Sequence, residues 1–413
     1  MANNQKITGD IFVPSDKSIS HRAIILSSLF SRITTIENIL LSDDVLATIN
    51  IMRALGVDIM LDKNKKMARV IGVGLYGLTA PRKSLDCGNS GTAMRLLCGL
   101  LSAQPFHSVL IGDASLSKRP MLRVAEPLRK MGATIHLSKN NTAPIEIIGN
   151  QPLMAIDYAL PVPSAQVKSA ILLASLYAQG ETVIKEKVKT RDHTEKMLTL
   201  FYAHAHAHLK IPGDLSSAAF FIVAACITPH SDLIIREVGI NSFRTGILHI
   251  LKLMGAHIEI VNERFFGNEP VADIHIRYSK LHGVVIPEKL IANAIDEFPV
   301  IFIAAVTAKG NTLLRGAKEL RVKESDRIAV MINNFKKLNI KTEEYDDGVL
   351  IYGDQHFQGG RVDADNDHRV AMSFAIAGNI ANDSVIIDNG EFIKTSFPNF
   401  VELANQIGMK ICL

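Results

Sequence analysis

One motif recurs six times along this chain, and the repeat limits the possible folds more than any other feature of the sequence. Each copy starts with a run of small and aliphatic residues of helical length, followed by a short turn and a β-rich strand. The six runs begin at Ala23, Arg95, Ala170, Phe220, Val300 and Ala371. Because they are apolar nearly all round, we expect their helices to be buried inside the domains.

A second element follows most copies, as in IMRALGVDIM and ILKLMGAHIEIV. The pattern predicts an amphipathic helix that ends at a glycine or asparagine and leads into a half-buried strand. Each repeat is therefore an α/β unit of about 70 to 80 residues. Six copies divide into three and three, which predicts one domain of residues 15–211 and a second of residues 1–14 plus 212–413. We expect the active site in the cleft between them.

The third repeat is shorter than the others by about 25 residues. The shortfall lies between Leu198 and Ile211, around the string FYAHAHAHLK, where the expected glycine-stop helix and strand are missing. We expect that a stretch is absent from the printed chain at this point. A true deletion is the alternative, and the mass of the intact protein decides between the two.

Composition indicates a globular protein of a reducing compartment. Of its 413 residues 47% are apolar, and the formal charge of +4 is too slight to predict a nucleic-acid surface, so small anions are the expected partners. The four cysteines form no CxxC pair and are expected to be buried thiols. The longest apolar run, Ala218 to Ile227, is about half a membrane span. We expect a cytoplasmic protein that neither is exported nor spans a membrane.

Two polar motifs come directly before apolar helices. VPSDKSISHRA places Lys17, Ser18, Ser20 and Arg22 at the start of the first, and LDCGNSGTAMR places small residues around Gly91 at the start of the second. Helix N-termini carry unpaired N–H groups and a partial positive charge, so each motif predicts an anion site. An ordinary N-cap with solvated charges is the alternative for each taken alone.

Further segments repeat this character. PVPSAQVKSA and IPGDLSSAAFF enter the third and fourth apolar helices. Four other motifs supply cations that can grip phosphate or carboxylate: Lys118, Arg119, Arg191, Lys323, Arg327, His368 and Arg369. The segment IDEFP puts Asp296 and Glu297 before a fifth apolar helix, either as a helix-dipole cap or as an acid/base group among cations such as Lys17, with Glu324.

Two patterns suggest sites that we do not expect. Residues 72–77 match GxGxxG, but the sequence LTAPRKS follows in place of a helix, so a dinucleotide fingerprint is not predicted. His204, His206 and His208 alternate as on one face of a strand and could hold a metal, but they lie at the shortened repeat. We expect no metal there.

Together these motifs resemble the 5-enolpyruvylshikimate-3-phosphate (EPSP) synthase family. The likeness runs in order from Val13 to Pro398 through DKSISHRA, GNSGTAMR, KRPM, PSAQVKSA, RDHTEKM, GDLSSAAF, IDEFP, RVKESDR and NDHR. The resemblance implies a two-domain inside-out α/β barrel, the enolpyruvyl transferase fold. It is built from six βαβαββ units, three in each domain.

The resemblance also implies the reaction. Members join shikimate 3-phosphate to phosphoenolpyruvate and release phosphate on the way to chorismate and the aromatic amino acids, as monomers without metal or organic cofactor. The implied contacts of shikimate 3-phosphate are Lys17, Ser18, Arg22, Ser164, Ala165, Gln166, Arg191, Asp296 and Lys323. Those of phosphoenolpyruvate are Lys17, Gly91, Arg119, Gln166, Arg327 and Arg369.

The chemistry assigns roles to three of these side chains or their neighbours. Asp296 is the expected base for the 5-hydroxyl, and Glu324 and Lys17 are expected to share proton delivery and removal at C3 of phosphoenolpyruvate. The subgroup that this sequence resembles includes members insensitive to the inhibitor glyphosate, which have alanine in place of Gly91. Because Gly91 carries no methyl group, we expect a glyphosate-sensitive enzyme.

Two other functions fit the sequence less well. The sibling family that transfers enolpyruvyl to a UDP-sugar shares the fold but uses a loop cysteine, whereas KRP stands in the comparable loop here. A non-catalytic basic RNA-binding protein would need aromatic stacking platforms, but aromatic residues make up 6% of the chain and tryptophan is absent.

Overall fold

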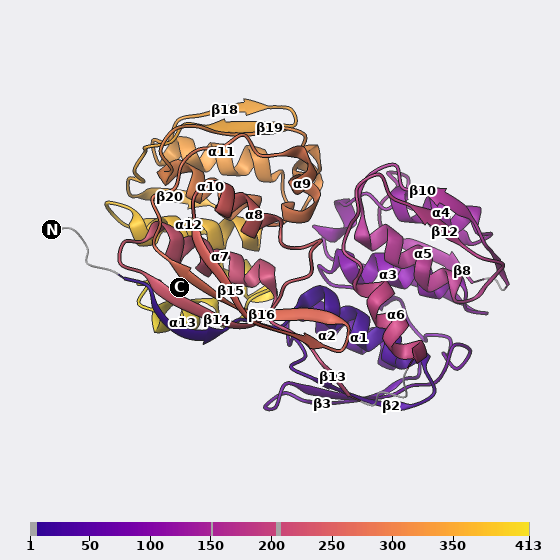
Figure 1. Ribbon diagram of the computed structural model, residues 1–413. Helices are drawn as coiled ribbons and strands as arrows, with labels where there is room; N and C mark the ends of the chain where they lie inside the picture. Colours follow the sequence, from indigo (N-terminus) through magenta and orange to yellow (C-terminus); the bar gives the residue numbers. More distant parts are fainter. Residues whose placement is uncertain (1–5, 150–151, 204–207, 413) are drawn as a thin grey trace. The chain divides into compact units, whose positions relative to one another are not determined.

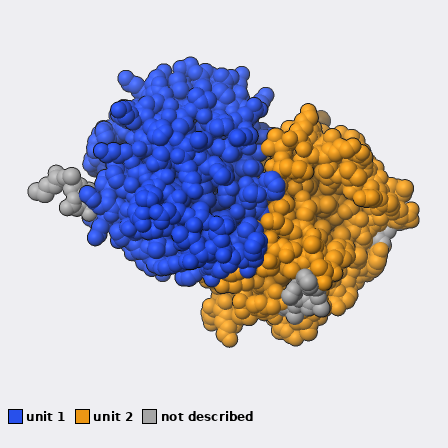
Figure 2. All heavy atoms as spheres, viewed as in Figure 1, with its two compact units in different colours: residues 1–14, 212–265, 270–413 blue, residues 15–211, 266–269 orange. Residues whose placement is uncertain are grey.

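The computed structural model describes residues 6–149, 152–203 and 208–412. Contacts within the chain divide it into two compact units (Figure 2). Unit 1 comprises residues 1–14, 212–265 and 270–413, and unit 2 comprises residues 15–211 and 266–269. Each unit has its own hydrophobic core, and the two cores share no residue.

Three four-stranded sheets share one topology. In each, the strand after a buried helix pairs in parallel with one neighbour and antiparallel with the other, and a fourth strand lies beyond the antiparallel one. The strand orders are β13-β2-β4-β3 and β5-β6-β8-β7 in unit 2, and β1-β14-β16-β15 in unit 1 (Figure 1). The strands of unit 2 are β2 (Ile33–Glu37), β3 (Asp58–Asp62), β4 (Met67–Ile71), β5 (Leu85–Asp86), β6 (His107–Ile111), β7 (Thr134–Leu137), β8 (Ile145–Ile148) and β13 (His208–Lys210). Those of unit 1 are β1 (Thr8–Phe12), β14 (Asp232–Gly239), β15 (His257–Phe266) and β16 (Glu269–Arg277), whose adjoining ends belong to unit 2.

The remaining sheets have fewer strands, three or two each. In unit 1, β17 (Thr312–Leu314), β19 (Gly348–Ile351) and β18 (Thr342–Tyr345) form a three-stranded sheet, and Val285 bridges in parallel to β17. Three parallel pairs complete the set: β9 (Leu153–Met154) with β11 (Ala178–Gln179), β10 (Asp157–Ala159) with β12 (Val183–Lys185), and β20 (Gly360–Asp363) with β21 (Val385–Asp388).

The six apolar runs form buried helices, as the sequence predicts. They are α1 (Lys17–Leu29), α3 (Gly91–Ser102), α5 (Ala165–Ser175), α7 (Leu215–Ile227), α10 (Phe298–Thr307) and α12 (His368–Ile380). Every residue of α7 is buried, and Thr307 is the one residue of α10 that is not. A helix without a polar face cannot cover a domain surface, so these helices fill the cores.

The predicted helix stops are also confirmed. Five helices are followed within two residues by a left-handed glycine or asparagine: α2 (Asp43–Ala54), α4 (Leu122–Lys130), α8 (Gly246–Leu253), α11 (Arg327–Lys337) and α13 (Phe400–Gln406). The stop residues have φ values between 59° and 100°: Gly56, Gly132, Gly255, Asn339 and Gly408. Glycine, and to a lesser degree asparagine, adopts this conformation with little strain.

The shortened repeat ends differently. Helix α6 (His193–Ala203) is followed by residues 204–207, which lie outside the described residues, and then by β13. Between Leu198 and Ile211 the described residues hold the end of α6 and β13, without the helix stop and hairpin of the other repeats. The cause of the shortening stays a prediction.

Four residues depart from the expected division at 212. Residues 266–269 belong to unit 2 because they pack against α6. The Asn268 side chain donates to the Lys196 carbonyl at 3.1 Å, and Glu269 Oε1 lies 2.7 Å from His193 Nδ1. The sequence carries no local signal for this contact, because its partners are more than 70 residues away.

One cysteine differs from expectation. Cys87, Cys98 and Cys226 are buried, and burial raises the pKa of Cys98 and of Cys226 to about 12, which keeps both as thiols. Cys412 is exposed, because the chain leaves the core after Met409. Among the described helices, none has the length and apolar character needed to cross a membrane.

Candidate active site

The first anion motif forms the N-terminal turn of α1 in unit 2. Asp16 caps this helix, since its Oδ1 accepts a hydrogen bond from the Ile19 amide at 2.8 Å. The Lys17 ammonium donates to Asp44 Oδ2 on α2 at 2.9 Å, with 18% and 11% of the two side chains exposed. The Lys17 amine is therefore held at the helix start beside unpaired N–H groups.

Arg22 lies one turn further along α1 and is 3% exposed. Its guanidinium donates to the Thr194 hydroxyl at 2.7 Å, to the Ser169 hydroxyl at 2.6 Å and to the Ser18 carbonyl at 2.9 Å. All three acceptors are neutral. Within the described residues, no carboxylate lies within ion-pairing distance of Arg22, so its buried charge has no carboxylate in direct contact.

The environment of Arg22 is thus electrostatically incomplete. Burial lowers its pKa to about 10; Asp16 and Glu195 act in the opposite direction, and the positive charge of Arg191 lowers the pKa further. A buried cation without a partner destabilises a fold unless a ligand supplies the opposite charge. Arg22, with Arg191 close enough to repel it, predicts an anion in this part of unit 2.

The GNSG loop builds a second anion motif at the start of α3. The Ser90 hydroxyl accepts from the Ala93 amide at 3.1 Å, and the Asn89 side-chain oxygen accepts from Arg119 at 2.6 Å. A methyl group on Gly91 would lie 3.0 Å from Arg95 Nη1 and 3.3 Å from Arg119 Nη1. The missing side chain therefore leaves room beside two guanidinium groups.

Gln166 joins this loop to α5. Ser164 caps α5, and Gln166 in its first turn accepts from Arg95 at 2.6 Å and donates to the Thr92 hydroxyl at 2.9 Å. Arg95 lies one turn into α3 and is not among the site residues that the sequence predicts. Its hydrogen bond to Gln166, 71 residues away, holds the side chain of a residue that we expect to bind substrate.

His21 connects the two anion motifs through buried side-chain contacts. Its Nδ1 lies 2.7 Å from the Thr48 hydroxyl, and its Nε2 lies 3.4 Å from the hydroxyl of Ser90, the cap of α3. Burial lowers the pKa of His21 to about 3, although Asp44 opposes the shift. The imidazole is therefore neutral at physiological pH and acts as a hydrogen-bonding spacer.

Unit 1 carries a second cluster, centred on Arg327 at the start of α11. Its side chain is fully buried and lies 2.8 Å from Asp367, 2.5 Å from Glu324 and 3.5 Å from Asp296. Burial alone would lower the pKa of Arg327, but Asp367, Glu324 and Asp296 more than offset it, so the pKa is raised. Arg327 stays charged and holds three carboxylates around it.

Asp296 is the carboxylate of this cluster with the most varied partners. Its Oδ1 lies 3.4 Å from Lys323 and 3.5 Å from Arg327. Its backbone carbonyl accepts from Arg369 Nη1 at 3.1 Å. The structure thus brings together Asp296, Glu324 and the three cations that the sequence assigns to the second half of the site.

Glu297 supports Arg369 from inside the core. It is 1% exposed, lies 3.8 Å from Arg369, and accepts a short hydrogen bond from the Ser216 hydroxyl. The buried Arg244 in turn donates to Ser216 at 2.6 Å and to Asp214 at 2.8 Å. Sequence reasoning left the role of Glu297 open and missed Arg244, because neither side chain has a partner nearby in the sequence.

The predicted residues therefore fall into two sets, one in each unit. The set in unit 2 is Lys17, Ser18, Arg22, Gly91, Arg119, Ser164, Ala165, Gln166 and Arg191. The set in unit 1 is Asp296, Lys323, Glu324, Arg327 and Arg369. Members of both sets lie in the first turn of a helix, where anions are favoured: Lys17, Ser18, Gly91, Ala165 and Gln166 in unit 2, and Arg327 and Arg369 in unit 1.

The two other patterns form no comparable site. The GxGxxG segment at 72–77 runs through turns, and the next helix, α3, begins at Gly91. His208 Nε2 lies 2.9 Å from Glu37 on the neighbouring strand, whereas His204 and His206 lie outside the described residues. The described residues contain no cluster of three or more metal-binding side chains.

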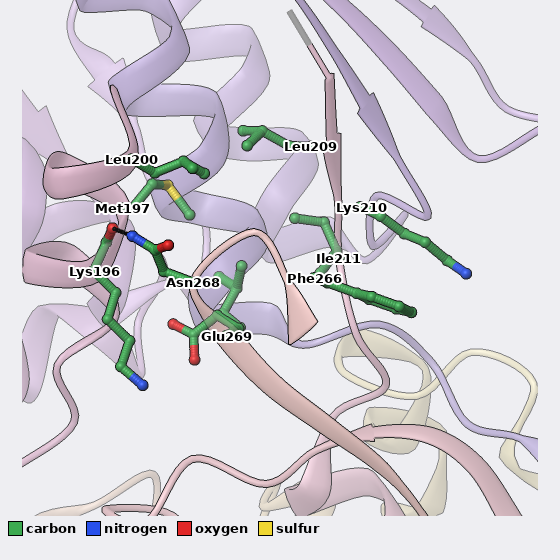
Figure 3. A pocket seen from close by; sticks show the side chains of 10 residues that line it. Lys196, Met197, Leu200, Leu209, Lys210, Ile211, Phe266, Asn268 and Glu269 are labelled. Atoms are coloured by element: carbon green, nitrogen blue, oxygen red, sulfur yellow. Dashed lines mark hydrogen bonds between the residues drawn. The ribbon is translucent and has the colours of Figure 1, made fainter. Parts of the chain in front are cut away.

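A small hollow opens in unit 2 between α1, α6, β13 and residues 266–269 (Figure 3). Its walls are mostly apolar, with Met197, Leu200 and Leu209 beside Phe266, and the Lys210 ammonium lies over the Phe266 ring, 4.3 Å from the ring centroid. None of the predicted substrate-binding residues lines it. This hollow is therefore separate from the candidate active site.

Comparisons with known proteins show the family of this chain. The family model of EPSP synthase (3-phosphoshikimate 1-carboxyvinyltransferase) matches residues 1–403. A curated 3-phosphoshikimate 1-carboxyvinyltransferase of Legionella pneumophila is 51% identical over 421 residues, covering 98% of this chain and 96% of its own. One of Coxiella burnetii is 48% identical, covering 99% and 96%.

Solved structures give the same family. The EPSP synthase of Acinetobacter baumannii has a TM-score of 0.87 at 46% identity and covers 99% of this chain and 98% of its own. An enolpyruvyl transferase of Streptomyces tendae, at 16% identity, has a TM-score of 0.77 over 99% and 97% of the chains and supports the fold alone. The predicted enolpyruvyl transferase fold is confirmed, and the chain belongs to the EPSP synthase (3-phosphoshikimate 1-carboxyvinyltransferase) family.

Proposed function

We propose that this chain transfers the enolpyruvyl group of phosphoenolpyruvate to the 5-hydroxyl of shikimate 3-phosphate and releases phosphate. This is a step of the shikimate pathway, which leads to chorismate and the aromatic amino acids. Relatives of about half identity over nearly the whole chain carry the name of this activity. The structural observation that supports it best is the buried Arg22, whose charge has no carboxylate partner among the described residues.

The phosphate of shikimate 3-phosphate is the anion proposed for this position. Arg22 and Arg191 would supply the positive charge, and the N-termini of α1 and α5 would supply N–H groups. Ser18, Ser164, Ala165 and Gln166 lie on these two helix starts. Asp296 and Lys323 would contact the hydroxyl groups at the other end of the substrate.

Phosphoenolpyruvate carries a carboxylate and a phosphate, so it needs more than one cation. In unit 2, Lys17, Gly91, Arg119 and Gln166 are the proposed contacts, and in unit 1 they are Arg327 and Arg369. Neither unit carries all the proposed contacts of either substrate. We therefore propose that both sets act on the same substrates, in a cleft between the two domains that excludes water when the substrates bind.

The chemistry requires two proton transfers. As Asp296 takes the proton of the 5-hydroxyl, the oxygen attacks C2 of phosphoenolpyruvate, and C3 receives a proton from Lys17 or Glu324. The tetrahedral intermediate then loses a proton from C3 to the same pair while its C2–O bond to phosphate breaks. The new double bond completes the enolpyruvyl ether, and phosphate leaves.

The cations lower the barrier by electrostatics. Two phosphates and a carboxylate repel at close range, and at a separation of 4 Å each pair of unit charges costs about 4 kcal/mol at an effective dielectric constant of 20. Lys323, Arg327 and Arg369 are held by carboxylates and helix starts, so they need little reorganisation to bind anions. We also propose that the enzyme acts in the cytoplasm as a monomer.

The test is phosphate release from shikimate 3-phosphate and phosphoenolpyruvate. The wild type should be active, and Asp296→Asn should lower kcat about 10²- to 10⁴-fold, the usual loss on removing a general base. Asp388→Asn is the matched control, because Asp388 forms an exposed ion pair with Arg361 in the same unit. Its kcat should equal that of the wild type.

Two results would contradict the proposal. No phosphate release by folded wild-type protein refutes the proposed reaction. Full activity in Asp296→Asn leaves the reaction standing and refutes the assignment of Asp296 as the base.

A further inference from the structure

Lys168 is a buried lysine of unit 2 that has no role in the proposed chemistry. It lies on α5, one turn after Ser164, and its side chain is 5% exposed. Its ammonium lies 3.1 Å from Glu186 Oε2, 2.8 Å from Glu195 Oε1 and 3.2 Å from the Thr190 carbonyl. A lysine has three N–H donors, so these three acceptors satisfy it completely.

The partners of Lys168 close the loop that leads to Arg191. Glu186 Oε1 accepts from the Thr190 amide at 3.1 Å and from the Thr190 hydroxyl at 2.5 Å. The other oxygen of Glu186 accepts from Lys168. The backbone of Thr190 is therefore fixed on both sides, at its N–H by Glu186 and at its carbonyl by Lys168. The next residue is Arg191.

Arg191 lies in a position that needs such support. Its charge acts on the buried Arg22, so two like charges are close together before an anion binds. Like charges at short range favour positions that separate them, and a fixed backbone limits the positions that the Arg191 side chain can reach. Glu195, which Lys168 also holds, acts on Arg22 with the opposite sign. The network thus fixes the loop and offsets part of the repulsion.

We infer that Lys168 is a positioning residue, which fixes Arg191 for the phosphate of shikimate 3-phosphate through Glu186 and Thr190. The inference rests on the proposed function, since that assigns Arg191 to this substrate. Lys168 itself contacts neither substrate in the proposal. A contribution of Lys168 to stability alone is the alternative, because removing one partner of a buried ion pair destabilises most proteins.

Affinity for shikimate 3-phosphate, measured by titration calorimetry, separates the two roles. Lys168→Met should raise the Kd about tenfold or more, as expected when a charged hydrogen bond to the ligand loses its geometry. Lys185→Met is the matched control. Lys185 lies in the same unit, 17 residues after Lys168, and forms an exposed ion pair with Asp157. Its Kd should equal that of the wild type.

Thr190 gives a milder test if Lys168→Met does not fold. Thr190→Val removes the hydroxyl that donates to Glu186 and keeps the shape of the side chain, whereas Thr190→Ser keeps the hydroxyl. Thr190→Val should raise both the Kd and the KM for shikimate 3-phosphate several-fold, and Thr190→Ser should restore them. The kcat should change less than the KM, because the residue acts on binding.

A double-mutant cycle with Arg191 decides whether the effect passes through that residue. If it does, adding Thr190→Val to Arg191→Met should not weaken binding further. Additive losses would overturn the inference, as would wild-type affinity in both folded Lys168→Met and Thr190→Val. Failure of the proposed function looks different: wild-type protein would then release no phosphate and bind no shikimate 3-phosphate.

Discussion

Arg22 is held entirely by neutral groups, and its removal leaves those groups satisfied. The hydroxyl oxygens of Ser169 and Thr194 lie 2.7 Å apart and can form a hydrogen bond with each other. The Ser18 carbonyl belongs to α1, the helix that carries Arg22. If Arg22 binds the phosphate as proposed, its charge contributes to ligand binding at the expense of the folded state. Its removal should therefore lower the affinity for the ligand far more than the stability of the fold.

We expect Arg22→Met to melt no more than a few degrees below the wild type, because the methionine fills the same buried space without a charge. Shikimate 3-phosphate should raise the Tm of the wild type and leave that of the variant unchanged. Thermal unfolding with and without this ligand measures both effects. A variant that keeps the full ligand-induced shift would show that the anion binds elsewhere.

Gly91 controls the space beside Arg95 and Arg119. A methyl group there would meet one guanidinium at 3.0 Å and the other at 3.3 Å, so both side chains must shift by a few tenths of an ångström. We expect Gly91→Ala to raise the KM for phosphoenolpyruvate a few-fold and to weaken inhibition by glyphosate more strongly. Inhibition assays on both proteins test this, and equal inhibition would contradict it.

At the scale of elements, α1 and α2 meet through two matched pairs. Lys17 and His21 are one turn apart on α1, and they contact Asp44 and Thr48, which are one turn apart on α2. His21 also contacts the hydroxyl of Ser90, the cap of α3, so its imidazole links α1, α2 and α3 next to the anion motifs. The tie depends on a neutral imidazole, which makes it sensitive to acid.

The pKa of His21 is about 3 in the folded protein and 6.5 in an exposed chain. Between these values the unfolded chain binds a proton that the folded chain does not, so stability falls as the pH falls. The slope from this group is about 1.4 kcal/mol per pH unit. We expect urea unfolding of His21→Gln between pH 6.5 and 4.5 to show a smaller slope than the wild type. Equal slopes would contradict burial of a neutral His21.

Helices α3 and α5 pack closely because Gly99 has no side chain. A methyl group there would lie 2.1 Å from the Ala170 carbonyl oxygen, which belongs to backbone and cannot yield. We expect Gly99→Ala to cost about 1–3 kcal/mol of unfolding free energy or more. Gly378→Ala is the control, since its added methyl group would lie 3.4 Å from Val385, an ordinary contact distance, and alanine favours helix. Denaturant titration of both variants is the measurement.

The elements of this fold were largely predictable, and their partners were not. Helices such as α7 are apolar on every side, and stops such as Gly56 need a left-handed backbone, so local sequence determines both. Motifs likewise single out Arg22 and Asp296 as candidate site residues, which stay predictions. The pairing of His193 with Glu269, and the support of Arg369 by Glu297, depend on which distant segments meet in the fold. No local pattern encodes such contacts.

At the scale of the molecule, each unit has a complete core but only part of the set of residues proposed to bind the substrates. If one chain supplies both sets, two inactive variants cannot help each other. Mixing Arg22→Met, changed in unit 2, with Asp296→Asn, changed in unit 1, should therefore restore no phosphate release. Recovery of activity in the mixture, assayed over a range of protein concentrations, would mean that two chains share a site and would contradict the proposed monomer.

During synthesis of the chain, strand β1 is made long before the strand with which it pairs. Thr8 pairs with Asp232, and Phe12 with Arg236, so β1 has no partner until 224 further residues have been made. At about 5–20 residues per second, a ribosome needs roughly 11–45 s for that distance. For this time β1 is an unpaired strand beside a unit 2 that is already largely made, and unpaired strands readily join other chains. Nascent chains of this protein should therefore gain most from a chaperone before β14 leaves the ribosome.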